Sequence, residues 1–133
     1  MIKQYLLSPG PTPIPNEVAL AMSETMVHHR TPQFNKVFEE ARQGLKALFG
    51  TKGDVLMLAS SGTGAMEAAV SNLFSPGDKV LVINGGKFGE RWLNIANAFA
   101  LDPIEVKVEW GQAVKVDAIE KQLKLHPDIQ SVM

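Results

Sequence analysis

Apolar positions recur with two periods along most of the chain, and these periods predict alternating strands and helices. Continuous apolar runs or strict alternation, both typical of strands, mark four segments: residues 55–59, 79–84, 104–109 and 128–133. Helix formers or helical spacing mark the segments between them: a helix whose first turns are residues 65–69, then residues 90–100 and 116–125. This order predicts an α/β fold with a mostly parallel sheet and right-handed crossovers, in which the alternating third strand lies nearer an edge.

The beginning of the chain has a different pattern. Repeated prolines between Pro9 and Pro15 predict an extended arm with bends over residues 1–15. Proline lacks a backbone donor and disfavours both helix interiors and central strands. Pro15 itself is expected at the first position of a short helix over residues 16–22, where its missing N–H costs nothing.

A longer amphipathic helix is expected next. Thr31 is a suitable N-cap, Pro32 suits the first helical position, and apolar residues then follow at helical spacing. Gly50 is expected to end this helix in the left-handed conformation. We expect residues 1–31 to form an N-terminal arm and short helix, and residues 32–133 to form an α/β domain.

Composition narrows the classes of partner. The chain has 133 residues, 45% of them hydrophobic and 20% charged, which is ordinary for a globular domain with a real core. Its net charge of -1 gives no electrostatic reason to expect nucleic acid or an anionic membrane as a partner. No cysteine is present, and no apolar run approaches a membrane span or a secretory signal. A cytoplasmic protein is the default expectation.

The loop over residues 60–64 is the first candidate site. It joins a predicted strand to a helix start, where unpaired N–H groups and the helix dipole favour an anion such as phosphate. Gly62 would let a phosphate approach the backbone, and Ser61 and Thr63 add hydroxyl donors. The alternative is a helix capped by Ser61 or Thr63 with no ligand, since the loop lacks the full glycine fingerprints of nucleotide sites.

A second loop, over residues 85–89, also follows a strand. Ligands of parallel α/β sheets bind beyond the carboxyl ends of the strands, so both loops lie on the expected rim. Phe88 stands between glycines in this loop, and two interpretations are open. It is either a core residue, as most phenylalanines are, or a flat platform for a planar ligand whose phosphate lies at the first loop.

Two further candidates precede these loops. Gly10, in Ser8–Pro11, either lines a pocket with close backbone access or belongs to a plain arm. The pair His29–Arg30 is either an anion clamp or a solvated basic loop, because guanidinium grips carboxylate or phosphate bidentately. Adjacent histidines in this unperiodic stretch match a metal site poorly, so we expect no metal.

Five sequence segments together carry a resemblance: LLSPGPTPIP, HHRTPQF, SSGTGAMEAA, SPGDKVLV and GGKFGERW. In this order and spacing they resemble the class V, fold-type I pyridoxal-phosphate aminotransferases, in the serine–pyruvate and alanine–glyoxylate branch. Members labelled as a soluble hydrogenase subunit are especially similar, although no metal-ligand set for hydrogenase chemistry is visible here. The resemblance implies an N-terminal arm and part of the mostly parallel large-domain sheet of such a transferase, with residues 32–133 in its cofactor-binding domain.

The resemblance also implies roles for particular residues. Ser61, Gly62 and Thr63 match the family loop that holds the phosphate of pyridoxal 5'-phosphate (PLP). Phe88 matches the aromatic residue, often tryptophan, that stacks on the pyridine ring. Gly10 matches an N-terminal glycine that approaches the substrate.

The pair His29–Arg30 matches residues that, in related enzymes, reach the active site of the neighbouring subunit and grip an anionic substrate group. The resemblance therefore implies a homodimer. It also implies transfer of an amino group from a small amino acid, serine- or alanine-like, to a 2-oxo acid such as pyruvate or glyoxylate.

The catalytic groups of the family lie further along than this chain reaches. None of its lysines matches the Schiff-base position, and the aspartate on the pyridinium nitrogen and the arginine on the substrate carboxylate have no counterparts here. The chain also stops inside a predicted strand at residues 128–133. We therefore expect an N-terminal portion of a longer enzyme, without catalytic residues of its own and inactive alone.

Three other functions stay open from the sequence. The first is a truncated, non-catalytic module for phosphate ligands or for protein interaction. The second is a different PLP reaction on the same scaffold, such as that of a lyase or a desulfurase. The third is a nucleotide-binding domain, which is weakened by the missing glycine fingerprints.

Overall fold

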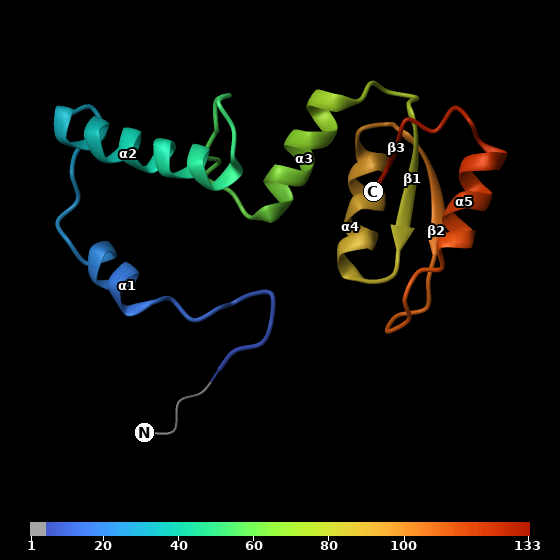
Figure 1. Cartoon of the computed structure of the whole chain (residues 1–133), viewed down its shortest axis with the longest axis horizontal. Helices are drawn as coiled ribbons and strands as arrows, with labels where there is room; N and C mark the ends of the chain where they lie inside the picture. Colours follow the sequence, from blue (N-terminus) through green and yellow to red (C-terminus); the bar gives the residue numbers. More distant parts are fainter. Residues whose placement is uncertain (1–4) are drawn as a thin grey trace. The chain divides into compact units, whose positions relative to one another are not determined.

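The computed structural model of the chain describes residues 5–133 (Figure 1). The first four residues of the predicted arm lie outside this part. The chain divides into two compact units, Met1–Leu56 and Met57–Met133, and each is described by itself. The domain boundary that we expect after residue 31 stays a prediction.

The first unit contains the two expected helices, which are confirmed as α1 (Asn16–Met22) and α2 (Pro32–Phe49). The hydroxyl oxygen of Thr31 accepts a hydrogen bond of 3.3 Å from the backbone N–H of Phe34, which satisfies one orphan donor of the helix start. Gly50 ends α2 with a φ of 62°, as expected. Pro15, expected as the first helical residue of α1, is instead its N-cap.

The described part of the first unit buries none of its side chains fully. Residues 5–15 form neither helix nor strand, in agreement with the expected arm. On α2, Val37 is 59% exposed and Leu48 is 80% exposed, so the apolar face of this helix has little cover. This unit therefore has no core within the described residues.

The second unit is an α/β layer structure around a three-stranded parallel sheet. Its strands are β1 (Lys79–Asn84), β2 (Asp102–Lys107) and β3 (Ser131–Val132), in the order β2-β1-β3. Its helices are α3 (Gly62–Leu73), α4 (Lys87–Ala98) and α5 (Val116–Leu125). The predicted α/β class, the parallel pairing and the edge position of the third predicted strand are confirmed.

The core of the second unit lies on the central strand. Val80, Leu81 and Val82 of β1 are fully buried, as expected of a strand covered on both faces. Val80 and Val82 pack in one cluster with Val70 of α3 and with Ile95 of α4. Side chains alternate along a strand, so Leu81 points to the other face, and α4 and α5 lie on opposite sides of the sheet (Figure 1).

The strand predicted at residues 55–59 is wrong. These residues form no strand, and Leu56 and Leu58 are 83% and 53% exposed. A buried strand needs partners on its edges, and β1 already has β2 and β3 as neighbours, while no described strand pairs with this segment. An apolar run in the sequence does not indicate whether such partner strands exist.

Four element boundaries also differ from expectation, and one of them is the last strand, predicted at residues 128–133 and found as β3 over Ser131–Val132. Helix α3 begins at Gly62, one turn before residues 65–69, and α4 covers Lys87–Ala98 in place of residues 90–100. Strand β2 lies at residues 102–107 in place of 104–109, because its pairing with β1 aligns Asp102 with the first residue of that strand. Pro103 is tolerated within it because β2 is an edge strand.

No helix in the described part of the chain is long and apolar enough to cross a membrane.

Candidate functional site

The start of α3 presents backbone donors. Ser61 is its N-cap in an extended conformation, and the side chain of Ser61 makes no capping hydrogen bond. The N–H groups of Gly62 and Thr63 lie in the first turn, where a helix offers them no acceptor, whereas Gly64 N–H donates to the Ser61 carbonyl at 2.9 Å. Ser61 thus takes the N-cap position that the sequence offered, but without a capping bond from its side chain, and Thr63 lies inside the helix. The helix start keeps donors and a positive dipole end for an anion.

A pocket of about 300 Å³ lies between the starts of α3 and α4, and we name it the α3–α4 pocket. Its lining residues are Ser61, Gly62, Thr63, Met66, Phe88 and Arg91. The four residues that the sequence predicts as cofactor contacts thus line one pocket, inside one unit of the chain. Their contacts with a ligand stay a prediction.

Two glycines near this pocket differ in what surrounds them. A Cβ placed on Gly62 would meet no atom within 4 Å, so open space lies directly against the backbone at the helix start. A Cβ on Gly89 would collide with the carbonyl oxygen of Ile83 and come within 2.8 Å of the Cα of Asn84. Gly89 therefore allows α4 to pack closely on the end of β1, while the packing does not require a glycine at position 62.

Phe88 is the second residue of α4 and is 63% exposed. The interpretation of Phe88 as a core residue is therefore wrong. Its ring lines the α3–α4 pocket together with Met66, which supplies the other apolar part of the wall. An exposed aromatic ring beside polar donors suits a planar ligand with an anionic group.

Arg91 is the lining residue that the sequence did not single out as a candidate. Its Nη1 donates a hydrogen bond to the Oγ1 of Thr63, which joins α4 to the start of α3. Residues three apart lie on one face of a helix, so the spacing from Phe88 to Arg91 was the available signal. Which face of α4 meets α3 could not be read from that spacing.

The first unit holds the remaining candidates, and the α3–α4 pocket is built without them. Gly10 is exposed, and a Cβ there would meet nothing within 4 Å. The rings of His28 and His29 stack with centroids 4.5 Å apart, and the backbone N–H of Arg30 donates to His28 Nδ1 at 3.1 Å. These residues form a turn before α2, and their contacts with a substrate stay a prediction.

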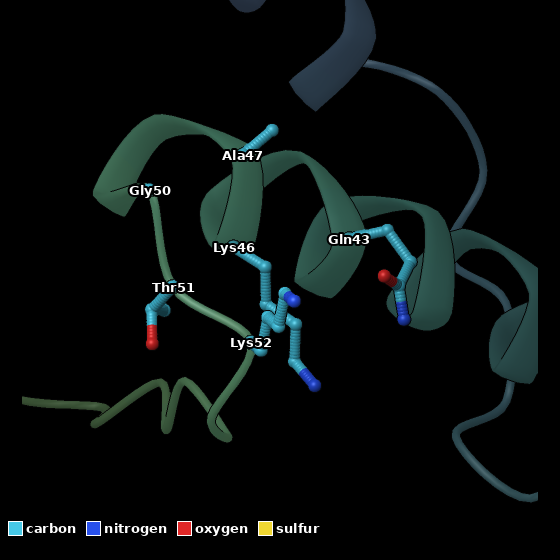
Figure 2. A pocket seen from close by; sticks show the side chains of 6 residues that line it. All are labelled: Gln43, Lys46, Ala47, Gly50, Thr51 and Lys52. Atoms are coloured by element: carbon cyan, nitrogen blue, oxygen red, sulfur yellow. The ribbon is translucent and has the colours of Figure 1, made fainter.

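A second hollow, of about 500 Å³, lies at the end of α2 (Figure 2). It is lined by Gln43, Lys46, Ala47, Gly50, Thr51 and Lys52. The ammonium of Lys46 is bound to Asp54 at 3.2 Å, and a helix C-terminus carries partial negative charge. Neither feature favours an anion, and in residues 5–133 no group of three or more histidine, cysteine, aspartate or glutamate side chains could hold a metal ion.

A parallel α/β sheet with a donor-rich pocket beside the carboxyl end of its central strand is the arrangement expected of a ligand-binding α/β domain. Residues 4–133 match the protein family described as Aminotransferase class-V. The chain therefore belongs to the class-V aminotransferase family, and the resemblance found in the sequence is confirmed.

Two relatives and one solved structure illustrate the match. A soluble hydrogenase 42 kDa subunit of Anabaena cylindrica is 45% identical over 122 residues, or 92% of this chain and 32% of that protein. A serine–glyoxylate aminotransferase of Methylorubrum extorquens is 35% identical, over 98% of this chain and 33% of that protein. The structure of a subgroup IV aspartate aminotransferase from Thermus thermophilus has a TM-score of 0.78 at 40% identity, covering 87% of this chain and 33% of its own. The chain thus spans about a third of the length of the curated relatives it matches.

Proposed function

We propose that this chain is the N-terminal portion of a PLP-dependent aminotransferase and that it binds the phosphate and one ring face of the cofactor. The observation that carries the proposal is the α3–α4 pocket, which unites a helix start with an exposed aromatic ring. Family membership supports the same conclusion.

The chemistry of the lining residues fits PLP. The donors are the first-turn N–H groups of α3, the hydroxyls of Ser61 and Thr63, and the guanidinium of Arg91. No carboxylate lines the pocket, so nothing there repels a phosphate dianion. Met66 and Phe88 supply the apolar surface that a pyridine ring requires.

Each group would have one task in the complete enzyme. The N–H groups of Gly62 and Thr63 and the hydroxyls of Ser61 and Thr63 would hold the phosphate, and the open space at Gly62 gives it access. Phe88 would cover one face of the ring and exclude water from it. The bound cofactor supplies the electron sink for amino-group transfer, and these residues only bind and orient it.

The substrates that we propose are a small amino acid and a 2-oxo acid such as pyruvate or glyoxylate. The names of similar proteins support this class, since they include a serine–glyoxylate and an aspartate aminotransferase. Gly10, His29 and Arg30 would contact the substrate, with the guanidinium of Arg30 binding a carboxylate across a homodimer interface. We propose the homodimer for the complete enzyme on the same ground of resemblance.

The test uses the full-length protein that contains this chain, after its cofactor has been removed by dialysis against an amine. Added PLP should restore transfer from serine, alanine or aspartate to glyoxylate or pyruvate, measured as formation of the new amino acid. Restoration of elimination or desulfuration without transfer would identify another PLP reaction. Failure of the protein to bind PLP would refute the proposal as a whole.

A further inference from the structure

We propose that Arg91 is a positioning residue that orients the hydroxyl of Thr63 toward the phosphate of the cofactor, an inference that rests on the function proposed above. Arg91 and Thr63 line the same pocket and are joined by the hydrogen bond from Arg91 Nη1 to Thr63 Oγ1. They lie 28 positions apart in the sequence, so this contact exists only because α3 and α4 pack together.

The direction of this hydrogen bond determines what the hydroxyl can do. A guanidinium has donors and no acceptor, whereas a threonine hydroxyl has one donor and two acceptor sites. Thr63 must therefore accept from Arg91, and its own O–H proton cannot be used in this contact. The proton remains available for an acceptor in the pocket, and a phosphate oxygen is such an acceptor.

The charge of Arg91 is also available. Among the ion pairs of residues 5–133, Lys87 is bound to Glu90 on the same helix, whereas no carboxylate pairs with Arg91. A guanidinium that is not neutralised beside a helix start adds to the positive potential of that site. It polarises the Thr63 hydroxyl that accepts its N–H, which strengthens the hydrogen bond that this hydroxyl donates.

Helix α4 would then contribute to both the ring contact and the phosphate contact of the cofactor. Phe88 and Arg91 are one turn apart on the same helix face, and Gly89 lets that helix approach the end of β1. One helix would set both the aromatic platform and the hydroxyl of the phosphate site. Ring and phosphate contacts would be adjusted together by the packing of a single element.

The experiment compares two ligands that differ only in the phosphate. Affinities of the full-length, cofactor-free protein for PLP and for pyridoxal are measured by equilibrium titration. Arg91→Gln should weaken PLP binding by about ten- to hundredfold and pyridoxal binding by less than about twofold, since pyridoxal presents no phosphate oxygen. Equal weakening for both ligands would overturn the proposal and assign Arg91 to general packing.

A double-mutant cycle separates action through Thr63 from direct contact with the phosphate. If Arg91 acts through the hydroxyl, Arg91→Gln should have little further effect in a Thr63→Val background. Additive losses in the double variant would contradict the positioning role. Thr63→Ser keeps the hydroxyl and should retain sensitivity to Arg91→Gln.

Lys87→Gln is the matched control, because it removes one positive charge from the same helix without a contact to Thr63. Lys87→Gln should leave the ratio of PLP to pyridoxal affinity within about twofold of the wild type. A loss as large as that of Arg91→Gln would show that the net charge of the helix, and not the contact with Thr63, accounts for the effect of Arg91→Gln. Wild-type protein that binds PLP no better than pyridoxal would refute the proposed function itself. Wild-type discrimination that survives in Arg91→Gln would refute only the role of Arg91.

Discussion

Substitutions of Gly62 and Gly89 can separate a role in ligand binding from a role in packing, because open space surrounds the first and backbone atoms surround the second. We predict that Gly62→Val weakens PLP binding by about 3 kcal/mol, because its side chain fills the space where phosphate would meet the backbone. The stability of the cofactor-free protein should change by less than about 0.5 kcal/mol, since valine is no worse than glycine in a helix. Equilibrium titration and thermal unfolding of the full-length protein measure the two effects.

The variant Gly89→Ala provides the opposite control. The added methyl group would collide with the backbone at the end of β1, so it should cost about 1–3 kcal/mol of folding stability. If Gly62→Val leaves the PLP affinity unchanged while Gly89→Ala lowers the folding stability, the start of α3 does not bind the phosphate.

Phe88 offers a second prediction at the residue scale. Phe88→Ala should weaken PLP binding by about 1 kcal/mol or more through loss of ring stacking. Because the side chain is 63% exposed, the cofactor-free protein should lose less than about 0.5 kcal/mol of stability. Phe88→Trp should preserve binding, and a large loss of stability without ligand would instead show that the ring packs in the folded protein.

The residues of the pocket were predictable to different degrees. Ser61, Gly62 and Thr63 could be found because a small hydroxyl-bearing loop before a helix has a local chemical signature. Phe88 could be found because glycines surround it. Arg91 could not be predicted as a pocket residue, because its place there depends on which faces of α3 and α4 meet. This is a property of the tertiary structure.

At the scale of elements, local signals succeeded where the determinants are local. The cap Thr31, the stop Gly50 and the apolar run of β1 were interpreted correctly because each acts within a few residues. The prediction of a strand at residues 55–59 was wrong because a strand needs neighbouring strands, and the sequence of the segment does not show whether they exist. The early start of α4 was missed because Gly89 was treated as a loop residue, whereas it is a helical residue in close contact with β1.

An ion pair ties the ends of the sheet strands together. Lys79, at the start of β1, contacts Asp128 before β3 at 2.6 Å and Asp102 of β2 at 3.9 Å. The hydrogen bond with Lys79 lowers the pKa of Asp128, and the hydrogen bond with Asp128 raises the pKa of Lys79. The contact should therefore stabilise the packing of β1 against β3 around neutral pH.

The pKa directions give a pH dependence with a definite sign. The contribution of Asp128 is complete above its unfolded pKa of about 4 and is lost as pH falls through its lowered folded pKa. That of Lys79 is complete below its unfolded pKa of about 10.4 and is lost as pH rises through its raised folded pKa. Lys79→Met should thus lower the thermal midpoint at pH 7 and cost least at the acidic and alkaline extremes.

Lys107→Met is the matched control for this series, since Lys107 lies on the same sheet and forms no ion pair among residues 5–133. Its thermal midpoint should follow the wild type at every pH. A deficit of Lys79→Met that does not change with pH would show that the lysine stem, and not the ion pair, stabilises the sheet.

For the whole molecule, the two units differ in how much apolar surface they bury. The second has a core around β1, whereas the described part of the first has no buried residue. Contiguous exposed apolar surface favours association. A polypeptide of residues 1–133 made by itself should therefore self-associate with rising concentration, as measured by light scattering.

Leu48→Lys should reduce this association, because Leu48 is 80% exposed on α2. The control is Leu125→Lys, which changes a 60% exposed leucine of the second unit and should have a smaller effect. A polypeptide that stays monomeric at all concentrations, or an equal effect of the two substitutions, would contradict the assignment of the associating surface to the first unit.

The central claim is that the α3–α4 pocket binds the phosphate and ring of PLP, and a crystal structure of the full-length protein with PLP tests it most directly. The predicted result places phosphate oxygens about 2.7–3.2 Å from the backbone nitrogens of Gly62 or Thr63, with the pyridine ring face against Phe88. A structure in which PLP is bound with its phosphate away from the start of α3 would contradict the claim.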